Sequence, residues 1–368
     1  MGETRDAADT ATRLISLSFS DLPGWPEDDH AAAFAAFRRS AAVLAEHPPK
    51  SRGLGIDADA LRAALARAAA LPETLSAGDA RAFFERWFAP HAVVPPAGQG
   101  FFTGYYEPVV AGSRLRTAAF TVPLHVVPAD LVEFDPANPP PGIDPALRFA
   151  RKTGDGFSEY ADRAAIMAGA LDGQGLELVW LADPVDAFFI HIQGAARIRL
   201  TDGSTLRVTY AAKTGHPYAP IGRVLVARGA LAPGTATMPA IRAWLADHPQ
   251  EAAAVMAENR SYIFFREATV DDPALGPVAA AKVPLTPGRS LAVDRLLHSF
   301  HLPVWVETAL PDQASFSRLM IAQDTGSAIV GAARGDIFFG SGEAAGVLAG
   351  AMSAKGRFVV LAPLEAAA

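Results

Sequence analysis

Short apolar runs separated by turn residues fill this chain from about residue 100 onward, and they predict a mainly β fold. Arg197–Leu200 and Thr205–Tyr210 are the clearest pair, because Thr201-Asp-Gly-Ser204 between them is a strong hairpin signal. Helices are expected at about 219–228 and 239–258, and Pro-rich loop material fills 128–146. Further strands are expected at 101–108, 120–127, Leu176–Leu181, Ala187–Ile192, Tyr262–Arg266, Leu291–Val293, Val304–Glu307, Arg318–Gln323, Asp336–Phe339 and Arg357–Leu361.

The first hundred residues have a helical pattern instead. Apolar residues recur at helical spacing after Pro26-Glu-Asp-Asp29, whose carboxylates suit a helix N-terminus. The same pattern fills 57–72, and Ser76-Ala-Gly-Asp79 predicts the cap of a third helix. The aromatic residues of this third helix are interpreted as core: Phe83, Phe84, Trp87 and Phe88.

Length and strand density together predict two domains. At 368 residues the chain exceeds what one ordinary core can organise. Residues 109–271 are dense enough in strands and turns to form a domain of their own. We expect the flanking segments, 1–108 and 272–368, to pair into the other domain.

Composition excludes several classes of protein. Half of the residues are hydrophobic and 19% are charged, which indicates a globular protein. The net charge of −7, without a Lys/Arg run, argues against a nucleic-acid surface. The absence of cysteine excludes disulfides, thiol catalysis, cysteine-ligated zinc and a lipidated N-terminal Cys in this sequence.

No membrane-spanning segment is expected, because no stretch of 18 or more residues is uniformly apolar. The start, Met1-Gly-Glu-Thr-Arg-Asp6, lacks the basic and then apolar profile of a secretory leader. Two explanations stay open: a leader that is missing from this sequence, or a protein that never carries one.

Three aspartates in the last quarter of the chain are the strongest candidates for chemistry. Asp294, Asp324 and Asp336 each end or follow a short apolar run. A carboxyl group among other carboxyls, against apolar walls, can have a pKa raised enough for a general acid. The plainer interpretation is that each aspartate organises a turn. Asp324-Thr-Gly also matches aspartic proteases, but that chemistry needs two such carboxylates and the chain has one copy.

A set of short motifs, in order along the chain, resembles the membrane-bound lytic transglycosylase A family (MltA). The resemblance runs from about residue 100 to the end of the chain, and the helical first hundred residues add little to it. The motifs are Thr103-Gly-Tyr-Tyr-Glu-Pro108, His191-Ile-Gln-Gly-Ala-Ala-Arg197, Tyr210-Ala-Ala-Lys-Thr-Gly-His-Pro-Tyr218, Asn259-Arg-Ser-Tyr-Ile-Phe-Phe265, Ser290-Leu-Ala-Val-Asp294, Ala322-Gln-Asp-Thr-Gly-Ser-Ala-Ile329 and Arg334-Gly-Asp-Ile-Phe-Phe-Gly340.

The resemblance implies a fold and a reaction. The fold would be a double-psi β-barrel built from the N- and C-terminal segments, with a second β-barrel domain inserted and a glycan groove between the domains. The reaction would cut the β-1,4 bond between N-acetylmuramic acid and N-acetylglucosamine in peptidoglycan without water, leaving a 1,6-anhydromuramic end.

The resemblance also assigns roles to residues. Asp336 matches the catalytic acid, which would protonate the glycosidic oxygen and then accept the proton of the muramic C6 hydroxyl. Asp324 and Asp294 would tune Asp336, or would hold barrel turns together. The expected substrate contacts are Tyr105, Tyr106, Glu107, Gln193 and Lys213.

His191 is expected in a strand, on the face of Gln193. No His pair has metal-binding spacing, so we expect the histidines to be structural, and no metal or cofactor.

Two other functions stay open at this point. One is a carbohydrate-binding or wall-loosening module that uses the same barrel without cleavage, and the other is a muramidase that admits water. The expected partner is a peptidoglycan glycan strand, with cell-wall synthesis or divisome proteins as further candidates, and we expect a monomer. The expected location is the periplasm, with outer-membrane attachment in the native protein as an alternative.

Overall fold

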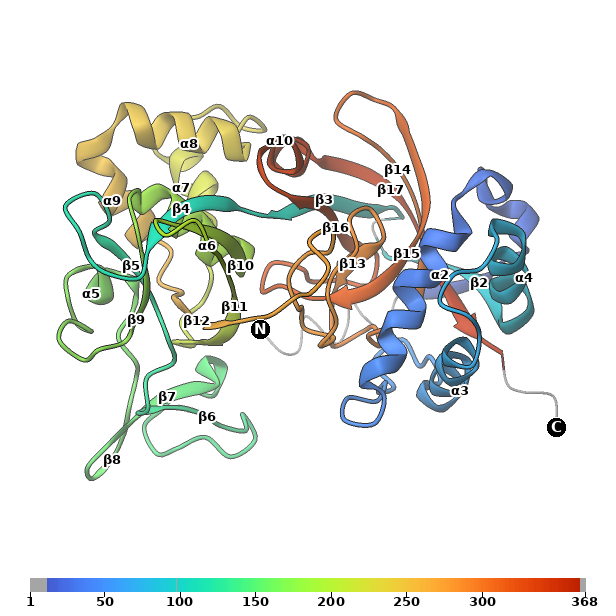
Figure 1. Ribbon diagram of the computed structural model, residues 1–368, viewed down its shortest axis with the longest axis horizontal. Helices are drawn as coiled ribbons and strands as arrows, with labels where there is room; N and C mark the ends of the chain where they lie inside the picture. Colours follow the sequence, from blue (N-terminus) through green and yellow to red (C-terminus); the bar gives the residue numbers. More distant parts are fainter. Residues whose placement is uncertain (1–11, 97, 365–368) are drawn as a thin grey trace. The chain divides into compact units, whose positions relative to one another are not determined.

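The computed structural model describes residues 12–96 and 98–364, which separate into two compact units (Figure 1). Unit 1 combines the N-terminal part of the chain, through Tyr106, with the C-terminal part from Val270 onward. Unit 2 is the segment between them, Glu107–Thr269. Each unit has its own sheet and its own buried apolar core, as expected of a domain.

The sheet of unit 1 joins both ends of the chain. Among the described residues it has eight strands in the order β1-β2-β17-β14-β15-β13-β16-β3, and β17 also pairs with β3. The strands are β1 (Arg13–Ser16), β2 (Phe88–Val94), β3 (Gly100–Glu107), β13 (Ser290–Val293), β14 (Pro303–Ala309), β15 (Ser315–Asp324), β16 (Arg334–Ser341) and β17 (Ser353–Pro363). The middle of the sheet is apolar: Trp305 of β14 is opposite Leu319 of β15 and Val359 of β17, and all three are fully buried.

The N-terminal helices pack on this sheet. Helices α2 (His30–Arg39) and α3 (Ala58–Ala69) contact β15 and β17, and α4 (Ala77–Trp87) packs on α2 (Figure 1). The side chains of Asp29, Asp57 and Ser76 accept backbone N–H bonds in the first turns, which explains where the three helices begin.

The aromatic residues of this region form the predicted core. Phe83, Phe84 and Phe88 are buried, and the rings of Phe34 and Phe83 meet edge to face at 5.0 Å. Trp87 is only partly buried, with the Arg67 guanidinium 4.2 Å from its ring centre. The prediction of a wholly helical first hundred residues is wrong at β1 and β2, since Phe88 begins a strand instead of extending α4.

Unit 2 contains two sheets. In the described part of the chain, the larger sheet has the order β12-β11-β10-β4-β9-β5, and β6-β7-β8 form the smaller one. The strands are β4 (Val109–Ser113), β5 (Val122–His125), β6 (Leu131–Glu133), β7 (Phe149–Thr153), β8 (Gly156–Ser158), β9 (Glu177–Leu181), β10 (Ala195–Leu200), β11 (Thr205–Lys213) and β12 (Ile263–Glu267). The predicted hairpin is confirmed, because β10 and β11 pair antiparallel with Arg199 opposite Thr205.

Unit 2 also contains helices, and a further helix follows β16 in unit 1. Those of unit 2 are α5 (Arg163–Met167), α6 (Pro184–Gln193), α7 (Ile221–Ala227), α8 (Met238–Asp247) and α9 (Pro249–Ala257), and that of unit 1 is α10 (Glu343–Ala351). Short 3-10 turns occupy Phe19–Asp21, Trp25–Glu27, Ser40–Val43 and Pro145–Leu147. None of the helices in the described residues is both long enough and apolar enough to cross a membrane.

The prediction of a strand at Ala187–Ile192 is wrong, because this segment lies in α6. Asp183 caps the first turn, Pro184 occupies the first helical position, and Gly194 ends the helix with a φ of 79°. The run itself is apolar on nearly every side, so it has no period that separates a helix from a strand. With this correction, the protein is mainly β with N-terminal helices, as the sequence predicts.

Candidate active site

Asp324 and Asp336 of unit 1 lie on the two strands that flank β13. Strand β13 pairs in parallel with β15 and antiparallel with β16, and Ala292 is the partner of Asp324 in one pairing and of Asp336 in the other. Because neighbouring strands are about 4.8 Å apart, the two aspartate backbones are about 10 Å apart at this level. Only the methyl group of Ala292 stands on the strand between them.

A β-bulge sets this register. The pairing of β13 with β15 shifts between Leu291 and Ala292, so that Gln323 falls out of register and Asp324 becomes level with Ala292. Gln323 is buried, and its amide nitrogen donates to the Ala36 carbonyl at 2.9 Å and to Ser40 Oγ at 3.0 Å. Its side chain is thus tied to α2 and the adjoining turn, which leaves Asp324 at the end of β15 beside Asp336.

Asp336 is held by the neighbouring strand β3. The Thr103 hydroxyl donates to Asp336 Oδ1, and Arg334 Nη2 donates to Thr103 Oγ1 at 2.6 Å. The Arg334 guanidinium also lies 5.2 Å from the ring centre of Phe101. Phe101, Thr103 and Tyr105 alternate along β3, so they share the face that meets Asp336.

Burial raises the pKa of Asp336 above its usual range, whereas the positive charge of Arg334 and the hydrogen bond from Thr103 lower it. The raised pKa follows from apolar surroundings that disfavour a charged carboxyl. A carboxyl group of this kind is suited to holding and transferring a proton.

Asp324 has a similar but distinct environment. Its Oδ1 accepts backbone N–H bonds from Thr325 at 2.9 Å and from Ala280 at 3.2 Å. Burial raises the pKa of Asp324 to about 6, against these hydrogen bonds, and the negative charge of Asp336 adds to the rise. The Asp336 carboxyl is therefore close enough to influence the ionisation of Asp324.

Tyr105 faces both carboxyls. It is 8% exposed, its ring lies 5.2 Å from that of Phe338, and its hydroxyl has no hydrogen-bond partner of standard geometry among the described residues. Burial and the charges of Asp324 and Asp336 raise the pKa of the Tyr105 hydroxyl well above its usual range. It therefore stays protonated and is a potential donor beside the two acids.

Asp294 lies in a turn directly after β13. It is 3% exposed, its Oδ1 accepts from the Leu296 N–H at 3.0 Å, and its Oδ2 accepts from the Gly331 N–H at 2.8 Å. Both carboxyl oxygens are thus engaged by backbone groups. This arrangement matches the turn-holding alternative for Asp294.

The other expected substrate contacts differ in exposure. Tyr106 is 9% exposed and packs against Gly346 of α10. Glu107 is 0% exposed, and its Oε2 accepts from Arg197 Nε at 2.5 Å, so its carboxyl is part of a buried ion pair. Gln193 at the end of α6 and Lys213 at the end of β11 are partly buried in unit 2.

His191 lies in α6, not in the expected strand, and it is buried. Its Nδ1 accepts the Ile263 N–H at 3.3 Å, and its ring lies 4.2 Å from that of Tyr262. Burial lowers the pKa of His191 well below its usual range, so the ring is neutral. Within the described part of the chain, no group of three His, Cys, Asp or Glu residues could hold a metal ion.

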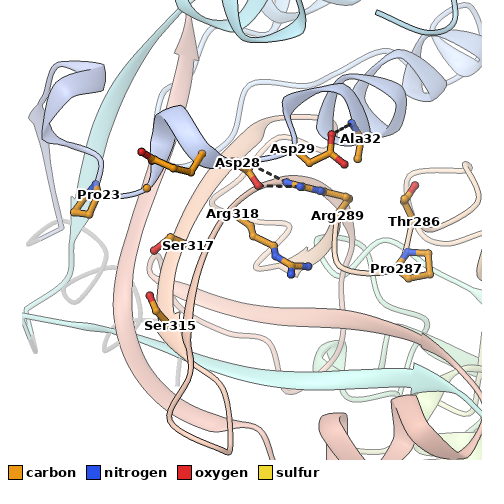
Figure 2. Close-up of a pocket in the computed structure, with 12 residues that line it drawn as sticks. Pro23, Asp28, Asp29, Ala32, Thr286, Pro287, Arg289, Ser315, Ser317 and Arg318 are labelled. Atoms are coloured by element: carbon orange, nitrogen blue, oxygen red, sulfur yellow. Dashed lines mark hydrogen bonds and ion pairs between the residues drawn. The ribbon is translucent and has the colours of Figure 1, made fainter. Parts of the chain in front are cut away.

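A separate cavity of about 670 Å³ lies at the start of α2 (Figure 2). Figure 2 shows Arg289 and Asp28 facing each other inside it, joined by hydrogen bonds of 2.8 Å. None of the expected site residues is among its lining residues, which are Pro23, Gly24, Glu27, Asp28, Asp29, Ala32, Thr286, Pro287, Arg289, Ser315, Ser317 and Arg318. The cavity is therefore distinct from the Asp324 and Asp336 pair.

Sequence reasoning missed Thr103, Arg334 and Phe101. Two of them lie within the motifs that were identified, Thr103 at the start of one and Arg334 at the start of another. The alternation of β3 was a usable signal, because it puts Thr103 on the same face as Tyr105.

Comparisons with known proteins identify the family of this chain. The family model described as "MltA specific insert domain" matches residues 101–266, and the one described as "3D domain" matches residues 289–362. The crystal structure of a membrane-bound lytic murein transglycosylase from Agrobacterium tumefaciens is 46% identical, covers 95% of this chain and 97% of that chain, and superposes with a TM-score of 0.88. This chain belongs to the MltA family.

Two further MltA relatives extend the comparison. MltA from Neisseria gonorrhoeae (monoclinic form) is 34% identical, with coverage of 96% of this chain and 93% of that chain and a TM-score of 0.78. The curated membrane-bound lytic murein transglycosylase A of Escherichia coli K12 is 33% identical over 269 residues, or 71% of this chain. The match spans 65% of that relative's length.

Proposed function

We propose that this chain is a lytic transglycosylase. It cleaves the β-1,4 bond between N-acetylmuramic acid and N-acetylglucosamine in peptidoglycan and leaves a 1,6-anhydromuramic end. The observation that carries the proposal is the Asp336 carboxyl, which is partly buried, has a raised pKa, and is held by Thr103 on one oxygen. Membership of the MltA family supports the substrate class.

The reaction needs one proton carrier. Asp336 starts neutral and gives its proton to the glycosidic oxygen as the bond from that oxygen to the muramic C1 breaks. The departing N-acetylglucosamine leaves with a hydroxyl group, and positive charge develops at C1. The muramic C6 oxygen then bonds to C1, and its proton passes to the Asp336 carboxylate. Asp336 is neutral again and no water is consumed, so a second carboxylate to activate water is not needed.

The neighbouring acids have supporting roles in this proposal. Asp324, level with Asp336 across Ala292, supplies negative charge near the developing cation when it is ionised. Asp294 holds the turn after β13 through its two backbone bonds.

We also propose roles for the expected substrate contacts. The Tyr105 hydroxyl is a hydrogen-bond donor beside Asp324 and Asp336, and Gln193 and Lys213 of unit 2 are proposed to bind glycan. Tyr106 and Glu107 are buried, so their proposed role is to support β3 from packing and from the Arg197 ion pair.

The finer fold assignment belongs to the same proposal. Unit 1 is a double-psi β-barrel formed by segments 1–108 and 272–368, and residues 109–271 are an inserted β-barrel domain. Support comes from the strand pairings of unit 1, which run β17-β14-β15-β13-β16-β3 and return to β17. The compact units divide the chain within two residues of these boundaries.

The natural setting follows from the substrate. We propose a periplasmic location, with attachment to the outer membrane in the native protein; the curated relatives are named membrane-bound. The partner is the peptidoglycan glycan strand. Proteins of cell-wall synthesis or division are further proposed partners, and the chain acts as a monomer.

Mass spectrometry of purified peptidoglycan digested in ¹⁸O-labelled water tests the proposal. The expected products carry anhydromuramic ends, one water lighter than reducing ends, and contain no label. Labelled reducing ends would instead identify a muramidase. Binding to peptidoglycan without new chain ends would identify a binding module.

A further inference from the structure

A chain of two hydrogen bonds leads from Arg334 through Thr103 to Asp336, and chemistry fixes the direction of the first of them. A guanidinium group only donates hydrogen bonds, so Arg334 Nη2 must donate to Thr103 Oγ1, 2.6 Å away. The Thr103 hydroxyl has a single hydrogen. With Arg334 on a lone pair, that hydrogen points to Asp336 Oδ1.

This direction restricts where the proton of neutral Asp336 can reside. A proton on Oδ1 could bond only to the second lone pair of Thr103 Oγ1, and the hydroxyl hydrogen would then have to turn away and give up its bond to Asp336. The observed bond from Thr103 to Oδ1 therefore favours the neutral acid with its proton on Oδ2. We propose that Arg334 and Thr103 are positioning residues that keep the transferable proton of Asp336 on Oδ2. The inference rests on the proposed function of Asp336.

The three residues are held by neighbouring strands. Thr103 lies on β3, Arg334 and Asp336 lie on β16, and the two strands are adjacent in the sheet. Arg334 has two further anchors: its Nη1 donates to the Gly335 carbonyl, and its guanidinium stacks on Phe101. Strand β3 is fixed on its other side by β17, where Thr103 is opposite Ser353. The donor thus reaches Thr103 from a fixed position.

The same chain affects the ionised state that follows proton transfer. The charged or titratable groups that face Asp336 are Arg334 on its own strand, Asp324 on β15 and Tyr105 on β3. Arg334 is the positive one among them and opposes the rise that burial causes in the pKa of Asp336. Removing Arg334 should favour the neutral acid, and removing the Thr103 hydroxyl should release the proton to either oxygen.

Two pairs of variants test this inference. Thr103→Val removes the hydroxyl, and we expect kcat to fall about tenfold or more with little change in KM, whereas Thr103→Ser should recover most of the loss. Thr308→Val is the matched control, since Thr308 is also a strand threonine of unit 1 whose hydroxyl bonds to a backbone carbonyl.

Arg334→Met should move the alkaline limb of the pH–rate profile upward by about one pH unit, and Arg334→Lys should move it less.

A titration separates this inference from the proposed function. In protein labelled with ¹³C at the aspartate carboxyls, the Asp336 signal is identified by its loss in Asp336→Asn. Its pKa should rise by about one unit in Arg334→Met, whether or not that variant is active. An unchanged pKa together with a wild-type rate in Thr103→Val would overturn the inference. Activity retained in Asp336→Asn would overturn the proposed function instead.

Discussion

The turn at Asp294 and the strand pair that carries Asp324 and Asp336 use the same residue type in different ways. At Asp294, backbone N–H groups of Leu296 and Gly331 occupy both carboxyl oxygens. At Asp336, a side-chain hydroxyl occupies Oδ1 and burial raises the pKa. Backbone donors stabilise a fixed anion, whereas burial with few donors favours a proton carrier. Asp324 combines both environments, with two backbone donors on one oxygen and a pKa of about 6.

Asp336→Asn should give the largest effect. The amide cannot supply the transferable proton, so turnover should fall about 1,000-fold, while glycan binding changes little. Rates on purified peptidoglycan and binding of chitohexaose, a β-1,4-linked N-acetylglucosamine hexamer, measure the two properties. Asp312→Asn is the control, because Asp312 is an exposed acid of unit 1 that caps a turn. A fall in binding as large as the fall in rate would contradict a purely catalytic role.

Asp294→Ala should lower the stability of the protein more than its turnover, the opposite of Asp336→Asn. It leaves the Leu296 and Gly331 N–H groups without their acceptor, so the free energy of unfolding should drop by about 3 kcal/mol. Asp294→Asn keeps one accepting oxygen and should lose less. Urea denaturation measures both variants. If folded Asp294→Ala protein loses turnover without losing stability, Asp294 belongs with the proton carriers and the comparison fails.

Asp324→Asn should give the smallest effect, and it should depend on pH. The pKa of about 6 in the folded state exceeds the ordinary value of 3.8, so the folded protein binds this proton more tightly than the unfolded chain. The stabilising contribution of Asp324 is therefore complete below about pH 4 and is lost as pH rises through about 6. The free energy of unfolding of Asp324→Asn, relative to that of the wild type, should therefore rise by about 2 kcal/mol between pH 4 and pH 7.

The design of this variant keeps the local hydrogen bonds. Both backbone donors reach the same oxygen, Oδ1, which an asparagine also offers. Thermal unfolding at pH 4, 5, 6 and 7 gives the profile of each protein. Parallel profiles for the wild type and Asp324→Asn would show that Asp324 titrates normally, and would group it with Asp294.

The sequence predicted the parts of the fold that local chemistry decides. Asp29, Asp57 and Ser76 begin helices because their side chains cap the next turn, and Thr201-Asp-Gly-Ser204 makes a hairpin without help from elsewhere. The failure at α6 has the opposite cause. Its apolar residues fit a helix or a strand equally well, and packing within unit 2 decides between them.

For the candidate site too, the sequence predicted the residues that a local pattern contains and not those that distant contacts bring together. The three aspartates were visible because each stands beside a recognisable apolar run. Their geometry could not be predicted, because the bulge at Gln323 is what brings Asp324 level with Asp336. The Gln323 amide at this bulge is buried and bonded to Ala36, which is distant in the sequence. The contact of Arg334 with Thr103 joins residues 231 positions apart, so no local pattern contains it.

Strand β17 has a consequence for the order in which this protein matures. It is the last strand of the described chain, and β2, β3 and β14 all pair with it. Unit 2 has all of its residues once Thr269 is synthesised, but β3, which carries Thr103, has only β16 as a possible neighbour until Ser353–Pro363 is synthesised. A polypeptide still in synthesis therefore has an incomplete sheet around Thr103 until its last described strand is made.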